Sequence, residues 1–179
     1  MRQIEELTCI QFESRTSESD FLYLVNGDGF VGLTPLITRT NTSDICRCHS
    51  KVGRVGGRQI LSLGPGCHDV GSVLHELGHA VGLYHEHMRY DRDQFLKIEW
   101  NNIAPSMQDQ FQKIPRTEYR PAATFDYNSI MIYGSKAFSK NGRKTMIPRK
   151  AGASIYESHY KRRLSQADII NMNTLYGCS

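Results

Sequence analysis

The segment His75-Glu76-Leu77-Gly78-His79-Ala80-Val81-Gly82-Leu83-Tyr84-His85 decides how this 179-residue chain folds and what it can bind. It fits the pattern H-E-x-x-H-x-x-G-x-x-H at every fixed position. Residues four apart share one face of a helix, so His75 and His79 can direct two imidazoles at one metal ion. Gly82 can adopt a positive φ, which lets the chain leave the helix and return His85 to the same ion. The segment therefore predicts a zinc site with three histidine ligands.

The ligand set also indicates what kind of zinc site this is. Three neutral nitrogens leave coordination positions open, which is typical of a catalytic and not of a structural zinc. Water bound at such a metal has a pKa near about 7, and Glu76 can accept its proton while it attacks a carbonyl carbon. Drawn evenly, the five fixed residues would coincide about once in three million starting positions. We therefore expect one Zn²⁺ per chain and Glu76 as the general base.

Helices and strands are expected around this segment in a mixed α+β arrangement. The apolar pattern from Val70 to Val81 predicts a helix, with Asp69 or Ser72 as its cap and Gly82 as its end. Ser165 and Asp168 form a capping-box pattern that opens a last helix through Ile169, Ile170, Met172 and Leu175. A short helix is expected at Arg2 to Leu7, and strands are expected at Cys9 to Phe12, Phe21 to Val25 and Arg58 to Leu63.

Composition excludes several other classes of protein. The chain is 39% hydrophobic, which suits a globular domain, and it has no stretch near the roughly 20 apolar residues that span a bilayer. The net charge is +4, but Lys and Arg are spread along the chain, so we expect neither nucleic-acid binding nor membrane insertion. Five cysteines favour an oxidising compartment, and their odd number leaves at least one thiol free, paired elsewhere or bound to metal.

Beyond the histidines, the sequence resembles the astacin family of metzincin peptidases. The family signature continues from the third histidine as Glu-His-x-Arg, which reads Glu86-His87-Met88-Arg89 here. Its methionine-containing turn, Ser-x-Met-His-Tyr, matches 129–133 except for Ile132, where histidine is usual. The similarity extends over nearly the whole chain, and among relatives it looks closest to secreted venom-type proteins of arthropods.

The resemblance implies a function and a role for each matching residue. It implies a secreted zinc endopeptidase that hydrolyses extracellular proteins by Glu-assisted attack of zinc-bound water, with peptides bound antiparallel to an edge strand. Met131 would form a hydrophobic floor under the zinc, and Tyr133 would be a further ligand that can stabilise the oxyanion. The implied disulfides are Cys9 with Cys178 and Cys48 with Cys67.

The resemblance also implies a domain plan with some departures from the family. We expect one peptidase domain over 1–179, with an amino-terminal lobe at 1–82 and a loop-rich carboxy-terminal lobe at 83–179 that ends in one helix. The family's first strand, signal peptide and propeptide are expected to be missing, which removes the amino terminus that pairs with the equivalent of Glu86. That glutamate is then either structural support or a surface residue. The stretch 30–47, with the odd Cys46, has no family counterpart and is expected to be a mobile surface insertion.

The sequence also allows two other interpretations. The first is an inactive, zinc-binding relative that serves as a binding module. The second is a structural zinc protein whose ligands come from Cys46, Cys48, His49, Cys67 and His68, since close Cys and His residues can form a closed tetrahedral site. The oligomeric state is not indicated by the sequence.

Overall fold

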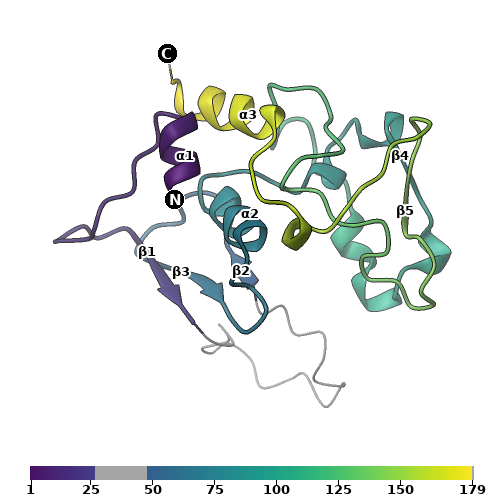
Figure 1. Ribbon diagram of the computed structural model, residues 1–179, viewed down its shortest axis with the longest axis horizontal. Helices are drawn as coiled ribbons and strands as arrows, with labels where there is room; N and C mark the ends of the chain where they lie inside the picture. Colours follow the sequence, from purple (N-terminus) through teal and green to yellow (C-terminus); the bar gives the residue numbers. More distant parts are fainter. Residues whose placement is uncertain (27–47, 179) are drawn as a thin grey trace.

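A computed structural model describes residues 1–26 and 48–178 of the chain and confirms the expected α+β class. Helices and 3₁₀ turns outnumber strands, and the larger sheet is confined to the first half of the chain (Figure 1). The elements in chain order are α1 (Arg2–Leu7), β1 (Phe21–Val25), β2 (Cys48–Ser50), β3 (Arg58–Leu63), α2 (Val70–Ala80), η1 (Glu86–Met88), η2 (Arg92–Gln94), β4 (Leu96–Ile98), η3 (Trp100–Asn102), η4 (Pro105–Phe111), β5 (Met146–Pro148), η5 (Ser158–Tyr160) and α3 (Gln166–Tyr176).

The first sheet has the order β1-β3-β2 and contains both parallel and antiparallel pairs. Strand β1 pairs in parallel with β3, and β2 pairs antiparallel with the other side of β3. The bounds of β1 and β3 confirm the two strands predicted at Phe21 to Val25 and Arg58 to Leu63. Among the described strands, β2 is therefore an edge strand, and it packs against α2.

The strand expected at Cys9 to Phe12 is wrong. The backbone N–H of Ile10 donates to the hydroxyl of Thr8 at 3.2 Å, and that of Phe12 donates to the carboxylate of Glu5 at 3.1 Å. Side chains next to the segment therefore satisfy donors that a sheet would otherwise pair. The apolar side chains at positions 10 and 12 are still partly buried against the core, which is why the segment alternates like a strand.

Helix α2 begins and ends where its caps place it. The Asp69 side chain accepts a hydrogen bond from the backbone of Ser72 at 2.9 Å, so Asp69 is the cap and Ser72 its partner. Leu74 and Leu77 are buried against the sheet. A Cβ on Gly71 would lie 1.9 Å from the carbonyl oxygen of Ser158, so only glycine lets η5 pack this closely on the helix.

Helix α3 has the predicted capping box, and its buried face carries polar side chains as well as apolar ones. Ser165 accepts from the backbone of Asp168, and Asp168 accepts from that of Ser165. Met172 is fully buried, whereas Ile170 and Leu175 are 40% and 55% exposed, because the helix also turns polar side chains inward. Figure 1 shows α3 beside α1 with both chain ends at one side of the molecule, and a disulfide between Cys9 and Cys178 joins them there.

Two hydrophobic clusters divide the described residues into two packed regions. The first lies between the sheet, α1, α2 and α3, and the second lies among the 3₁₀ turns and the β4–β5 pair. Met131 belongs to the first cluster and its neighbour Ile132 to the second, so the chain crosses from one region to the other at this point. A division into two lobes at residue 82 stays a proposal.

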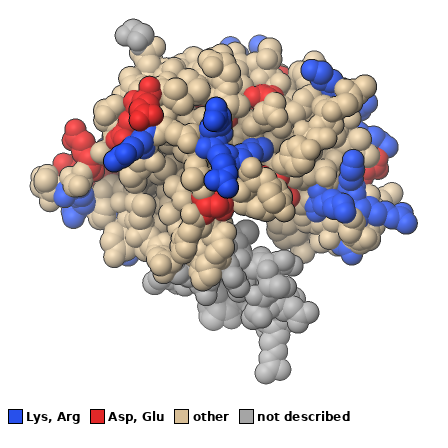
Figure 2. All heavy atoms as spheres, viewed as in Figure 1, with Lys and Arg blue, Asp and Glu red and all other residues tan. Residues whose placement is uncertain are grey.

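The expected insertion at 30–47, including Cys46, lies outside the described residues. None of the helices in 1–26 and 48–178 is both long enough and apolar enough to cross a membrane. On the face seen in Figure 2, Lys and Arg side chains form several separate groups with Asp and Glu among them.

Candidate metal centre

The structure brings the three predicted histidine ligands together at the end of α2. The Nε2 atoms of His75 and His79 lie 3.2 Å and 3.0 Å from the Nε2 atom of His85. One ring nitrogen from each of the three lies within 4.8 Å of the other two. His75 and His79 come from successive turns of one helix, while His85 comes from the segment that follows it.

Backbone carbonyls fix how two of these rings are protonated. Nδ1 of His75 donates to the carbonyl oxygen of Ile130 at 2.8 Å, and Nδ1 of His79 donates to that of Leu83, also at 2.8 Å. With the proton on Nδ1, the lone pair of each Nε2 points at the common centre. Burial lowers the pKa of His75 to about 4 and that of His79 to about 3, so both rings are neutral at pH 7.

The predicted chain reversal at Gly82 is confirmed. Its φ is +108°, which side-chain-bearing residues rarely adopt, and a Cβ there would lie 2.6 Å from Cδ2 of Leu175. The backbone N–H of Leu83 bonds to the carbonyl oxygen of Gly78 at 2.9 Å, which closes the helix. The chain then turns back, and His85 reaches the centre.

Glu76 lies inside the protein next to the first histidine. It is 5% exposed, and within the described part of the chain its Oε2 atom is buried without a hydrogen-bond partner. Burial raises the pKa of Glu76 to about 8 in the absence of metal, and a backbone hydrogen bond from Ser50 of β2 works against that rise. A carboxyl group of this kind can take up and release a proton at neutral pH.

The methionine turn, residues 129–133, lies directly beneath α2. Met131 is 1% exposed, and a Cβ on Gly78 would lie 2.6 Å from its sulfur, so the glycine between the two helix ligands lets the methionine reach the helix. Ile132, which replaces the usual histidine, is fully buried in the second cluster. Its apolar side chain therefore serves packing there.

Tyr133 lies against the third ligand. Its ring centroid is 4.3 Å from that of His85 and 6.4 Å from that of His75. A further buried residue for which the sequence predicted no role, His87, has its ring centroid 4.4 Å from that of Tyr133 and 5.3 Å from that of His85, and it donates from Nε2 to the carbonyl oxygen of Gln110. The signature places a histidine at 87, but spacing alone did not show that it would pack on the tyrosine.

Glu86 is a buried residue and not a surface one. It is 3% exposed, and its Oε1 atom accepts from Arg89 at 3.0 Å and from the backbone of Asp126 at 2.9 Å. Burial raises the pKa of Glu86 to about 7, against the opposing effect of the Arg89 charge. The guanidinium of Arg89 also bonds to both carboxylate oxygens of Asp91. A side-chain partner within the chain therefore compensates this buried charge.

Four of the five cysteines form the two pairs that the resemblance implied. Cys9 is bonded to Cys178, and Cys48 is bonded to Cys67. The second bond ties edge strand β2 to the loop after β3. Because Cys48 and Cys67 carry no thiolate, they are not ligands of a structural zinc, and the alternative that needed them is wrong.

Zinc fits the centre on the donors that the structure presents. For Zn–N bonds of about 2.0–2.1 Å, tetrahedral geometry puts ligand nitrogens about 3.3–3.4 Å apart, close to the two separations measured here. At least two lone pairs converge without a proton between them, an arrangement that a cation stabilises. Three imidazoles, with no thiolate beside them in the described ranges of the chain, also agree with a site that keeps a position open.

An α+β fold with a three-histidine centre on a helix and a buried methionine turn beneath it defines the metzincin class of zinc metalloproteases. The family model for the astacin peptidases matches residues 1–177. The chain therefore belongs to the astacin family.

Individual relatives agree with this assignment. The chain is 43% identical over 182 residues to astacin-like metalloprotease toxin 1 of Loxosceles intermedia, covering 99% of this chain and 62% of the toxin. It is 52% identical over 132 residues to zinc metalloproteinase nas-15 of Caenorhabditis elegans, covering 73% of this chain and 23% of that protein. The chain thus spans less than two thirds of the length of these relatives.

A solved structure shows the same fold. High choriolytic enzyme 1, a hatching enzyme zinc-protease of the medaka fish Oryzias latipes, superimposes with a TM-score of 0.82 at 36% identity. The match covers 100% of this chain and 80% of that one.

Proposed function

We propose that this chain is a zinc-dependent endopeptidase that hydrolyses peptide bonds of extracellular proteins. The observation that carries the proposal is the convergence of three imidazole nitrogens, together with a buried carboxylate oxygen of the adjoining Glu76 that has no partner in the described part of the chain. His75, His79 and His85 would hold the metal. When bound, zinc supplies a Lewis acid that acidifies water and polarises a carbonyl oxygen.

Glu76 is the proposed general base. Its Oε2 atom is buried and has no hydrogen-bond partner among the described residues, so it can take the proton of the attacking water and then deliver it to the leaving amine. Its other contact, from the backbone of Ser50, holds the carboxyl group next to strand β2. A nearby dication favours the ionised carboxylate, which offsets the effect of burial on its pKa.

Strand β2 is the proposed substrate platform. Within the described sheet it pairs only with β3, so its outer backbone groups can bond an extended peptide antiparallel. Because β2 also supplies Ser50, a peptide bound along it would pass beside Glu76. Backbone pairing gives affinity with little sequence preference.

The remaining residues have supporting roles in this proposal. Met131 packs under the helix that carries two ligands, and Tyr133, with its ring against His85, is proposed as a further ligand that can stabilise the oxyanion. Glu86 supports the segment after the third ligand through its bonds to Arg89 and Asp126. Two disulfides favour an extracellular location.

Cleavage of a quenched-fluorescent peptide pool tests the proposal. The wild-type chain should cleave the pool, and a zinc chelator should abolish cleavage. Glu76→Gln should bind zinc but cleave at least about 100-fold more slowly, because the proton acceptor is lost. Glu6→Gln, an exposed glutamate in α1, is the matched control and should keep full activity. A folded, zinc-loaded wild-type chain that cuts nothing would instead support the binding-module reading.

A further inference from the structure

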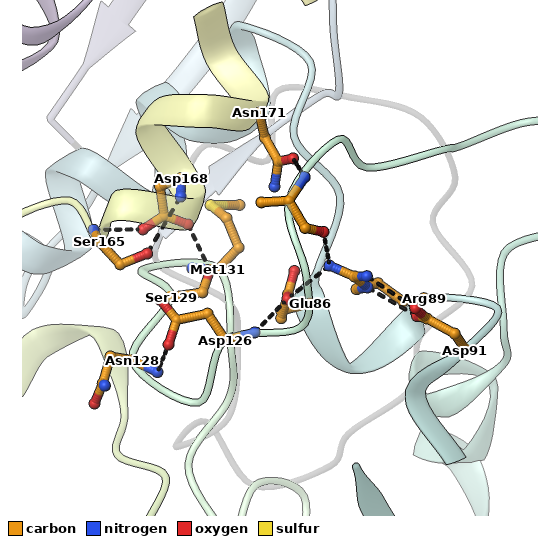
Figure 3. A network of polar contacts seen from close by, with 11 residues as sticks. Glu86, Arg89, Asp91, Asp126, Asn128, Ser129, Met131, Ser165, Asp168 and Asn171 are labelled. Atoms are coloured by element: carbon orange, nitrogen blue, oxygen red, sulfur yellow. Dashed lines mark hydrogen bonds and ion pairs between the residues drawn. The ribbon is translucent and has the colours of Figure 1, made fainter. Parts of the chain in front are cut away.

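Helix α3 turns two polar side chains into the protein. Asp168 and Asn171 are 2% and 7% exposed, and they lie one turn apart on the same face of the helix. Burying polar groups in a core costs stability unless each finds partners. Both side chains have partners here, and those partners lie in segments that lead to the metal centre (Figure 3).

Asp168 holds the methionine turn. Its Oδ1 atom accepts from the hydroxyl of Ser129 at 2.6 Å, and its Oδ2 atom accepts from the backbone N–H of Ile130 at 2.8 Å. The hydroxyl of Ser129 in turn accepts from the backbone N–H of Met131 at 3.0 Å. One carboxylate thus fixes three consecutive residues of the turn.

The peptide groups of Ile130 connect this carboxylate to a proposed metal ligand. The N–H of Ile130 donates to Asp168, and the carbonyl oxygen of Ile130 accepts from Nδ1 of His75 at 2.8 Å. Ile130 is fully buried, so no water competes for these bonds. The position of Ile130 therefore determines which ring nitrogen of His75 carries the proton and in which direction the ring points.

Asn171 supports a parallel route from the same helix. Its Oδ1 atom accepts from the backbone of Ala123 at 2.9 Å, and the carbonyl oxygen of Ala123 accepts from Arg89 at 3.0 Å. Arg89 binds Glu86, whose backbone N–H donates to the carbonyl oxygen of Met131 at 3.1 Å. The polar face of α3 thus contacts the methionine turn through Asp168, and it is linked to the segment after His85 through Asn171, Ala123 and Arg89.

The role of Asp168 in the capping box of α3 does not by itself explain why its side chain is buried. A capping box needs one acceptor for the N–H of Ser165, and an exposed carboxylate at the helix start can supply it. Asp168 provides that bond at 2.9 Å, but it is buried and also holds Ser129 and Ile130.

We propose that Asp168 is a positioning residue for the metal centre, which orients the imidazole of His75 through the peptide groups of Ile130. The inference rests on His75 being a metal ligand and does not require peptidase activity. It assigns a role in the centre to a residue far along the chain and outside both signature motifs.

Zinc affinity of the chelator-stripped full chain tests this role, measured by competition with a chromophoric chelator. Asp168→Ala should weaken zinc binding about 10-fold or more, as expected when a partner of a ligand is lost. Ser129→Ala, which keeps the Asp168–Ile130 bond, should weaken it less. Met172→Ala is the control, because Met172 is fully buried in the same helix but belongs to the apolar cluster and not to this network.

Spectra of the cobalt-substituted protein separate positioning from a general loss of stability. Asp168→Ala should shift the d–d bands, while Met172→Ala should lower the melting temperature and leave both the bands and the zinc affinity unchanged. If Asp168→Ala does not fold, a shift in Ser129→Ala still supports the proposal. Unchanged spectra and affinity in the folded Asp168 and Ser129 variants would overturn it, as would an equal loss of affinity in Met172→Ala.

Discussion

Removing the two disulfides one at a time should destabilise the chain unequally. The Cys9–Cys178 bond closes a loop with a sequence separation of 169, whereas the Cys48–Cys67 bond closes one of 19. A longer closed loop restricts the unfolded chain more, so its loss frees more conformational entropy. Replacing Cys9 and Cys178 with alanine should therefore cost more stability than replacing Cys48 and Cys67.

The loop lengths give the size of the effect. In the chain-entropy model the long loop contributes about 5 kcal/mol and the short loop about 3 kcal/mol at 25 °C. Cys67 is buried, so truncating it adds about 1 kcal/mol for lost packing. The Cys9/Cys178 variant should remain the less stable of the two by about 1 kcal/mol.

Urea denaturation measures both free energies of unfolding. Chelator in all samples removes the contribution of bound metal, and Cys46→Ala in every variant prevents thiol exchange. The denaturant dependence of the free energy should also increase, more strongly for the Cys9/Cys178 variant, because its unfolded state expands more. A greater loss of stability in the Cys48/Cys67 variant, or no change in that dependence, would refute the loop-entropy reasoning.

Three further predictions concern single residues. Arg89→Met should lower the free energy of unfolding, measured by urea denaturation, by about 3–5 kcal/mol, because Glu86 is left buried without its charge partner. A loss below about 1 kcal/mol would show that the ion pair contributes little to stability. Burial lowers the pKa of Lys161 from 10.5 to about 8, so between these pH values the native state binds fewer protons than the unfolded state. The free energy of unfolding of the wild type, relative to that of Lys161→Met, should therefore rise as the pH increases from 8 to 10.5. A difference that does not change with pH would contradict the lowered pKa. Gly82→Ala should weaken zinc binding in a chelator competition, because a Cβ there strains the backbone and meets Leu175, whereas an unchanged affinity would show that the turn adapts.

The parts of the fold that the sequence predicted well are those set by local rules. The helix at Val70–Ala80 follows from its apolar spacing and its Asp69 cap, and the last helix follows from the capping box at Ser165. Strands β1 and β3 were also predicted within their observed bounds, because both are short runs rich in strand-forming apolar residues. In each of these cases the signal lies within the element itself.

The parts that were missed depend on residues distant in the sequence. Strands β2, β4 and β5 are three residues each, too short for any periodic pattern to show. The apolar residues of α3 do not show which of its faces is buried, because Ile170 and Leu175 are exposed while Asp168 is buried against partners from the methionine turn. No spacing rule brings together residues that are 38 or 39 positions apart.

The candidate site shows the same division. The motif places His75, Glu76, His79 and His85, and the structure brings the three imidazoles to one point. The carbonyl groups that fix the ring protons come from Ile130 and Leu83, and neither is identifiable in the sequence because every residue has a carbonyl.

The most direct test of this account is a zinc titration of the chelator-stripped chain while peptide cleavage is followed. The stripped chain should be inactive, activity should rise in proportion to added zinc and reach its plateau at one ion per chain, and Glu76→Gln should bind the same single ion without gaining activity. Cleavage by the stripped chain, a plateau at two ions, or a folded one-zinc chain that cuts nothing would contradict the account.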